Sequence, residues 1–214
     1  MDFNEVLKNR RSIRDFTDKE VSDEIIFEIM NEAMQTASWV NSQPWKVYVI
    51  KNDIVKEAVR MHNFSYKNKE PMTSDYPHPR RQDWPKYASN HMTNANNYMK
   101  KMNVNMEEFT RVNYNFFNSS SIAILCVGKN SPIWSILDLG AFSSTLMLAA
   151  KNKGVDSCHA YEIIKFADNI RKLAKIPEEF SIVTAVALGY ASDHELNSFV
   201  SNRENVKDIC EIVK

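Results

Sequence analysis

The strongest structural pattern in this chain is a long apolar segment, residues 134–153, that follows a short apolar run. Residues 121–127 are almost continuously apolar and predict a buried strand. In the longer segment, Leu137 and Phe142 are among the apolar residues that recur around nearly every face of a helix, which predicts burial on more than one side. Gly154 follows directly and is expected to end this helix.

Other patterns predict further strands and helices on both sides of this unit. Residues 45–50 alternate and are rich in β-branched and aromatic side chains, and we expect strands there and at 180–188. Helices are expected at 2–9, after a Ser22 cap, at 53–61, at 162–175 and in a short tail segment between 194 and 214. The order favours an α+β fold, with a central mixed β-sheet packed by helices.

Residues 63–118 differ in composition from the rest of the chain. Prolines at 71, 77, 79 and 85 interrupt any long element early in this stretch. The polar, Asn- and Met-rich part from Trp84 to Phe117 is expected to be helical in two pieces. We therefore expect residues 1–214 to form a single domain, with an excursion at about 63–118 that forms a lid, a pocket wall or a subunit contact.

Composition argues against several classes of protein. The formal net charge is zero, so no overall charge favours nucleic acid or an anionic membrane. There is no uninterrupted run of 18 apolar residues and no leader-like start, so a soluble, cytoplasmic protein is expected. Cys126, Cys158 and Cys210 are far apart, which gives little support to a disulfide, a zinc site or thiol catalysis; Cys126 is expected in the core.

The chain has only four glycines, and none is arranged as in a Rossmann or P-loop phosphate-binding loop. If the protein binds a phosphate, side chains must bind it. Near the N-terminus, Arg10, Arg11, Ser12 and Arg14 bring three guanidinium groups and a hydroxyl together. Guanidinium groups bind phosphate oxygens in a bidentate manner, so this cluster is typical of a phosphate site. A solvated basic surface is the alternative on composition alone.

A second informative segment is Ala37-Ser38-Trp39-Val40-Asn41-Ser42-Gln43-Pro44-Trp45. Together with Arg-Arg-Ser-x-Arg-x-Phe, which Phe16 completes, it resembles the signature of the FMN-dependent nitroreductase family. Further matching motifs follow in order: Asp138-Leu139-Gly140, Gly154-Val155-Asp156-Ser157-Cys158 and Ala187-Leu188-Gly189-Tyr190. The resemblance therefore spans nearly the whole chain.

The resemblance implies how the FMN phosphate is bound. Arg10, Arg14 and Arg203 would neutralise it, and the Ser12 hydroxyl would donate to the phosphate or to the ribityl chain. Arg11 would either bond the edge of the flavin ring or face solvent.

It also implies contacts to the flavin ring. Ser38, Asn41 and Gln43 would contact the flavin, although the same residues are also ordinary turn formers. Backbone N–H groups of Tyr161 and Glu162 would bond flavin N5 and O4. His159 stands where relatives commonly have proline, which alters the pocket beside N5, and it is more simply interpreted as a partly buried histidine than as a catalytic acid.

The assembly and activity implied by the resemblance are specific. The protein is expected to be an intertwined homodimer, with the Gln-Pro-Trp strand near the flavin of the opposite subunit. It would take hydride from NADPH or NADH and reduce nitroaromatic or quinone-like acceptors by a ping-pong mechanism. No side chain need act as nucleophile or base, so no catalytic residue and no metal ligand is predicted. Two alternatives are an FMN-dependent oxidase or dehalogenase without a nicotinamide step, and a non-catalytic flavin-binding module.

Overall fold

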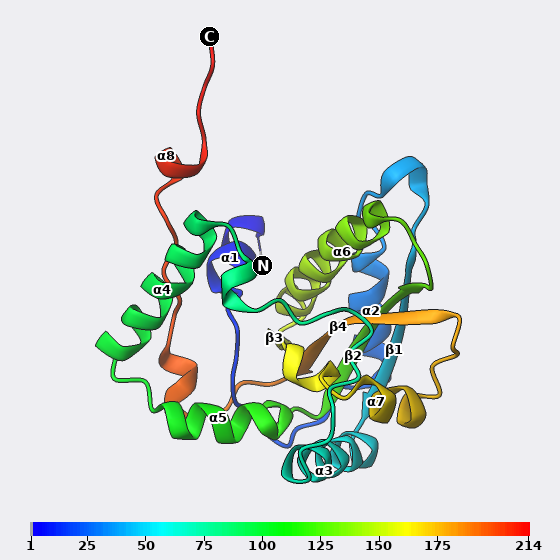
Figure 1. Cartoon of the computed structure of the whole chain (residues 1–214). Helices are drawn as coiled ribbons and strands as arrows, with labels where there is room; N and C mark the ends of the chain where they lie inside the picture. The colour runs from blue at the N-terminus through cyan, green and yellow to red at the C-terminus, as the bar shows by residue number, and fades with distance from the viewer. Residues whose placement is uncertain (1) are drawn as a thin grey trace.

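Four antiparallel strands form one sheet in the order β1-β2-β4-β3 in the computed structural model, which describes residues 2–214 (Figure 1). The strands are β1 (Trp45–Lys51), β2 (Ser121–Gly128), β3 (Asp156–His159) and β4 (Phe180–Gly189). The α+β class and the strands expected at 45–50, 121–127 and 180–188 are confirmed. The expectation of a mixed sheet is wrong, because these strands pair only in antiparallel fashion.

The central strand β2 is buried on both faces, which explains its continuous apolar sequence. Its side chains alternate between two separate cores, because successive residues of a strand point to opposite faces. Ile122, Ile124 and Cys126 belong to one core. Ala123, Leu125 and Val127 belong to the other. Cys126 is a fully buried core residue, as expected.

Helices cover both faces of the sheet (Figure 1). On one face α2 (Asp23–Ala33) packs with α6 (Ile133–Asn152) against the strands. On the other face lie α3 (Asp53–Lys67), α5 (Met106–Tyr114) and α7 (Ala167–Ala174). The sheet is thus sandwiched between two helical layers, each with its own apolar core.

The long helix α6 has the expected bounds to within one residue, but it is buried on one side only. Leu139, Phe142 and Leu146 face the sheet. In contrast, Ile133 is 73% exposed and Leu137 is 62% exposed. By length and composition α6 could also cross a membrane, yet its packing is that of a core helix with one open face.

The other expected helices are confirmed with altered bounds. Helix α1 (Phe3–Asn9) begins at an Asp2 cap, and the Ser22 Oγ accepts a hydrogen bond from the N–H of Ile25 at the start of α2. Helix α3 runs to Lys67, past the expected end at 61. The helix expected at 162–175 is instead two short ones, η4 (Tyr161–Ile164) and α7.

The stretch from 68 to 118 contains two helices, α4 (Lys86–Lys101) and α5, as the sequence suggests. Helix α4 has no buried residue and lies at the periphery (Figure 1). The loop before it is fixed to the body by Asp75, whose Oδ2 accepts hydrogen bonds at 2.6 Å from Arg171 and from the N–H of Ile182. The tail after β4 contains only η5 (Glu195–Ser198) and the four-residue α8 (Val206–Ile209).

The segment that carries the arginine cluster is anchored by Asp15 and Phe16. The buried Asp15 carboxylate accepts hydrogen bonds from Asn118 Nδ2 at 2.7 Å and from the Ser192 hydroxyl. The Phe16 ring packs against Gly189 so closely that a Cβ at Gly189 would lie 2.9 Å from Phe16 Cδ1. The N-terminal segment is therefore an integral part of the core.

Candidate functional site

The arginine cluster lies along the edge strand β3. Helix α1 ends at Asn9 with Arg10 as its C-cap, and the chain then forms an isolated parallel bridge between Ser12 and Ser157. The N–H of Ile13 donates to the carbonyl of Ser157 at 3.0 Å. The position of the cluster is therefore set by backbone bonds to β3 rather than by the arginine side chains.

Arg10, Arg11 and Arg203 line one cavity of about 610 Å³, which brings together residues from both ends of the chain. Lys8 and Lys151 also line it, and no carboxylate does. Within residues 2–214, none of the three arginines has an ion-pair partner; Arg203 instead donates to the carbonyls of Ser201 and Asn202. A cavity with several cations and no carboxylate is suited to a phosphate.

Lys151 is a residue that sequence reasoning missed. It lies in the last turn of α6 and donates to Asp156 Oδ1 at 2.8 Å. Its position in the sequence could have indicated its role. Lys151 lies at the end of the predicted helix, three residues before Gly154, where the Gly-Val-Asp-Ser motif begins.

Arg14 does not line that cavity, and its half-buried guanidinium lies between the rings of Phe109 and Phe199, 5.7 and 5.3 Å from their centroids. Its N–H donates to Asn197 Oδ1 at 2.8 Å, and Nη1 donates to the carbonyl of Ser12. Burial lowers the pKa of Arg14, and no carboxylate in the described chain pairs with it. A guanidinium this desolvated is stabilised when an anion binds beside it.

Cys158 connects the surroundings of Arg10, Ser12 and Arg14. Burial raises the pKa of its thiol to about 11, although Arg14, Ser12 and Arg10 all act in the opposite direction, which means that they lie around it. The thiol therefore stays protonated at neutral pH. It is a buried packing group in the wall of the cluster.

Tyr161 and Glu162 lie just beyond the other end of β3, in the first turn of η4. As the first residues of a helix, they have backbone N–H groups without partners inside it. The Glu162 carboxylate lies 3.2 Å from His62 Nε2 and 3.0 Å from Lys165 Nζ. His159 is an exposed residue rather than the partly buried histidine expected, and its Nε2 shares a hydrogen bond of 2.8 Å with Thr184 Oγ1.

Ser38, Asn41 and Gln43 form a separate loop before β1. Three residues there, Val40, Asn41 and Gln43, have left-handed φ angles of 44°, 58° and 44°. Ser38 Oγ accepts from the N–H of Gln43 at 3.0 Å, and Gln43 Nε2 donates to Asn41 Oδ1 at 3.1 Å. The loop is a defined structure whose polar side chains are partly to fully exposed.

Helix α6 holds this loop in place. Asp138 Oδ2 accepts from the N–H of Trp39 at 3.0 Å and from the Ser42 hydroxyl at 3.5 Å. The Trp39 ring stacks on Trp134, with centroids 5.3 Å apart. The Asp-Leu-Gly motif singled out in the sequence thus supports the Ser-x-x-Asn-x-Gln loop.

Within one chain, the two groups of predicted site residues lie at opposite corners of the sheet. Ser12 pairs beside β3, whereas Gln43 precedes β1 on the other edge. Trp45 aligns through β2 with Ser181 of β4, and Ser157 aligns with Leu188 of β4. Trp45 and Ser157 are thus three strand spacings apart across the sheet and seven residues apart along the strands, which gives a distance of roughly 27 Å between them. The structure brings Arg10, Arg11, Ser12, Arg14, Arg203, Tyr161 and Glu162 to one edge, and Ser38, Asn41 and Gln43 to the other.

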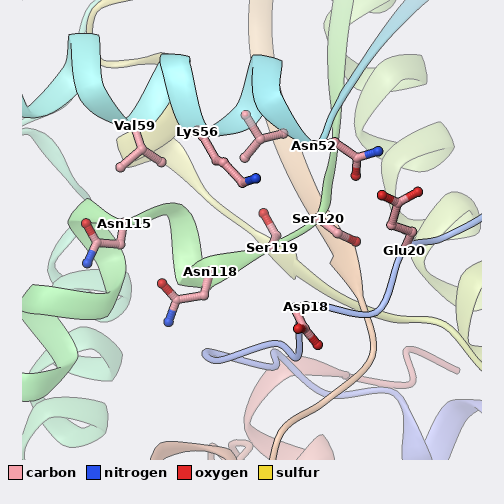
Figure 2. Close-up of a pocket in the computed structure, with 10 residues that line it drawn as sticks. Asp18, Glu20, Asn52, Lys56, Val59, Asn115, Asn118, Ser119 and Ser120 are labelled. Carbon is pink, nitrogen blue, oxygen red and sulfur yellow. The ribbon is translucent and has the colours of Figure 1, made fainter.

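A further cavity of about 390 Å³ lies between α3 and the segments 18–20 and 115–120. Figure 2 shows the carboxylates of Asp18 and Glu20 at one side of it, with Lys56 projecting from α3. It contains none of the predicted site residues, and its two carboxylates make it unsuitable for an anion.

Comparisons with known proteins agree with these features. The nitroreductase family model matches residues 7–190. The 4-nitrobenzoate reductases of Nocardioides sp. and Pseudomonas putida are 25% and 24% identical to this chain, over 95% of it and 87% and 92% of their own lengths. The FMN-dependent nitroreductase NfnB of Mycobacterium smegmatis, solved in complex with NADPH, has the same fold, with a TM-score of 0.90, 20% identity, and coverage of 99% of this chain and 97% of NfnB. The chain therefore belongs to the nitroreductase family, whose members are NAD(P)H-dependent FMN oxidoreductases.

Proposed function

We propose that this protein is an FMN-dependent oxidoreductase that takes hydride from NADPH or NADH and reduces nitroaromatic or quinone-like acceptors. The observation that carries the proposal is the cavity lined by Arg10, Arg11 and Arg203, without a carboxylate, in a chain of this family. The names of the 4-nitrobenzoate reductases support a nitroaromatic acceptor. A cytoplasmic location, where NAD(P)H is available, is consistent with this activity.

The donor set fits FMN. Its terminal phosphate carries close to two negative charges, and Arg10 and Arg203 would neutralise it from the cavity while Arg14 contributes from its aromatic surroundings. Ser12 would add a hydroxyl donor. Arg11 lines the same cavity and would bind phosphate rather than only face solvent.

The unpaired N–H groups of Tyr161 and Glu162 would orient the flavin ring. The redox chemistry that FMN supplies when bound is acceptance of hydride from NAD(P)H and its transfer to the acceptor, in the two halves of a ping-pong sequence. The side chains act by binding and orienting: the arginines fix the phosphate end and the η4 amides fix the ring end. Cys158 stays protonated and buried, so we assign it no part in the reaction.

We also propose that the functional unit is an intertwined homodimer. The diagonal of roughly 27 Å between the arginine cluster and the Ser38–Gln43 loop is too long for one flavin to contact both within a chain. A second copy would supply the loop. Exposed apolar residues next to the loop support this assembly: Val40, Ile133, Trp134 and Leu137.

The tail supports intertwining. Residues Val206, Ile209, Ile212 and Val213 are between 66% and 88% exposed, and the C-terminus points away from the body (Figure 1). A groove of about 570 Å³ lies between α2 and the unpaired edge of β1, lined by Phe27, Met30 and Met34 among others. An apolar tail and an open strand edge are complementary when two copies exchange tails.

The test begins with the absorption spectrum of the purified protein and with anaerobic titration by NADPH and by NADH. We expect flavin bands that bleach with at least one nicotinamide and recover when nitrobenzene or p-benzoquinone is added. Flavin bands that persist with both nicotinamides would favour the oxidase or dehalogenase alternative. A protein that is colourless and cannot be reconstituted with FMN would refute the proposal.

A further inference from the structure

His62 is the most unusual polar residue in the protein. It lies in α3, is 2% exposed, and is surrounded by the rings of Tyr114, Phe116 and Phe166, whose centroids lie between 5.1 and 5.9 Å from its own. An imidazole in aromatic surroundings loses its hydration, and this costs free energy unless a polar partner replaces the water.

The partner is Glu162, a residue of the proposed FMN site. Glu162 Oε1 lies 3.2 Å from His62 Nε2, within ion-pair distance but outside hydrogen-bond geometry, and neither ring nitrogen has a hydrogen-bond partner within the described chain. Burial alone would raise the pKa of Glu162, but His62 and Lys165 outweigh it and hold that pKa below its usual range. Glu162 is therefore a largely buried carboxylate between two cationic or polar partners.

This contact fixes the direction in which the η4 turn faces. The Glu162 side chain points into the core, toward α3, so its own N–H and that of Tyr161 remain free at the start of η4. The strand end before the turn is held separately, because the N–H of Ala160 donates to the carbonyl of Ala185 at 3.0 Å. Rotation of the turn is thus restrained by the Glu162 side chain.

We propose that His62 is a positioning residue for the flavin: by holding the Glu162 carboxylate inside the core, it aims the Tyr161 and Glu162 amides at the flavin ring. The inference rests on the proposed function, because it gives these amides a ligand. An aromatic side chain would fill the same space without burying polar nitrogens, so packing alone gives no reason for a histidine here.

The experiment compares His62→Phe, His62→Gln and a matched control. Ser65→Ala changes another buried polar residue of α3, whose hydroxyl accepts a hydrogen bond from Asn169 Nδ2 of α7 at 3.1 Å. For each protein we would measure the FMN dissociation constant of the apoprotein by fluorescence quenching, the reduction potential of the bound flavin, and the melting temperature.

We expect His62→Phe to weaken FMN binding by about tenfold, which is the effect of losing one hydrogen bond between an η4 amide and the flavin. The same loss should shift the reduction potential of the flavin. His62→Gln, whose amide can still donate to Glu162, should restore most of both. Ser65→Ala should lower the melting temperature and leave both flavin properties unchanged. Wild-type affinity and potential in His62→Phe would overturn the proposal, as would equal flavin effects in Ser65→Ala.

Two further outcomes are separable. If His62→Phe does not fold, Lys165→Met removes the other partner of Glu162, and an altered flavin potential in that variant supports the proposal while an unchanged one contradicts it. If the wild-type apoprotein binds no FMN, the proposed function itself fails. If the wild type binds FMN and His62→Phe binds it identically, only the role of His62 fails.

Discussion

The backbone of Ser12 pairs in parallel with that of Ser157, the second residue of β3. This pairing fixes the arginine cluster to the sheet through main-chain bonds, and Asp15 and Phe16 extend the anchoring into the core. The position of the segment therefore does not depend on ion pairs of the arginine side chains. Changes to these side chains should affect binding far more than folding.

Arg14→Ala is expected to weaken FMN binding by between about tenfold and a hundredfold, because a charge-assisted hydrogen bond to a ligand contributes about 1.5–3 kcal/mol. Fluorescence quenching of FMN by the apoprotein measures the dissociation constant. Arg14→Lys keeps the charge but loses the planar guanidinium, so its FMN affinity should lie between those of the wild type and Arg14→Ala. Undiminished affinity in Arg14→Ala, with normal circular dichroism, would remove Arg14 from the site.

Subunit complementation tests whether each site draws on two chains. Arg14→Ala impairs one edge of the chain, and Gln43→Gly impairs the other while tolerating the φ of 44° at that position. Each variant alone should be poorly active. Mixed by co-refolding, they should recover up to about a quarter of the wild-type sites, since half of randomly paired dimers contain one intact site. Activity no higher than the average of the two variants would mean that each site lies within one chain.

Glu108 should give the protein an acid-sensitive element. Hydrogen bonds from Arg111 at 2.7 Å and His194 at 2.8 Å hold its pKa at about 2, below its ordinary value of 4.5. Because the folded-state pKa is depressed, the stabilisation is present above about pH 4.5 and is lost as the pH falls toward 2. Melting temperatures of wild type and Glu108→Gln should differ at pH 6 and converge near pH 2. A constant difference in melting temperature across that range would argue against a depressed pKa of Glu108.

Thiol reactivity should distinguish the three cysteines. Burial raises the pKa of Cys126 to about 12 and that of Cys158 to about 11, whereas Cys210 is exposed in the tail. At pH 8 a chromogenic disulfide reagent should therefore react quickly with one thiol per folded chain and with all three after denaturation. Cys210→Ser should abolish the fast reaction. A fast reaction that persists in this variant would mean that the region around Cys158 opens in solution.

Much of the fold was predictable because the patterns are local. The apolar run of β2, the alternation of β1 and the Ser22 cap each determine their element within a few residues. Strand β3 was not predicted, because Asp-Ser-Cys-His has no apolar alternation and β4 is the only full strand that pairs with it. The helix expected at 162–175 is broken at Phe166, whose φ of −109° and ψ of 71° reflect burial of its ring rather than helix propensity.

The site was predictable in its residues but not in its arrangement. Motif order revealed the arginines and the Ser38–Gln43 loop, yet their positions at opposite corners follow from the strand order β1-β2-β4-β3, which no local pattern encodes. His62 was also inaccessible from the sequence, because its importance comes from Glu162, far along the chain, and from three aromatic rings. The tail, expected to form an amphipathic helix, forms little helix here, since its apolar side chains have nothing to pack against within one chain.

Gly189 and Phe16 come from opposite ends of the sequence and share one space, since the ring occupies the volume that any larger residue at 189 would need. We therefore expect the two positions to change as a pair. A larger residue at 189 should be tolerated only where residue 16 is smaller, and phenylalanine at 16 should accompany glycine at 189. Covariation between these positions among descendants of this sequence would record that the N-terminal segment and the last strand have been inherited as one packing unit.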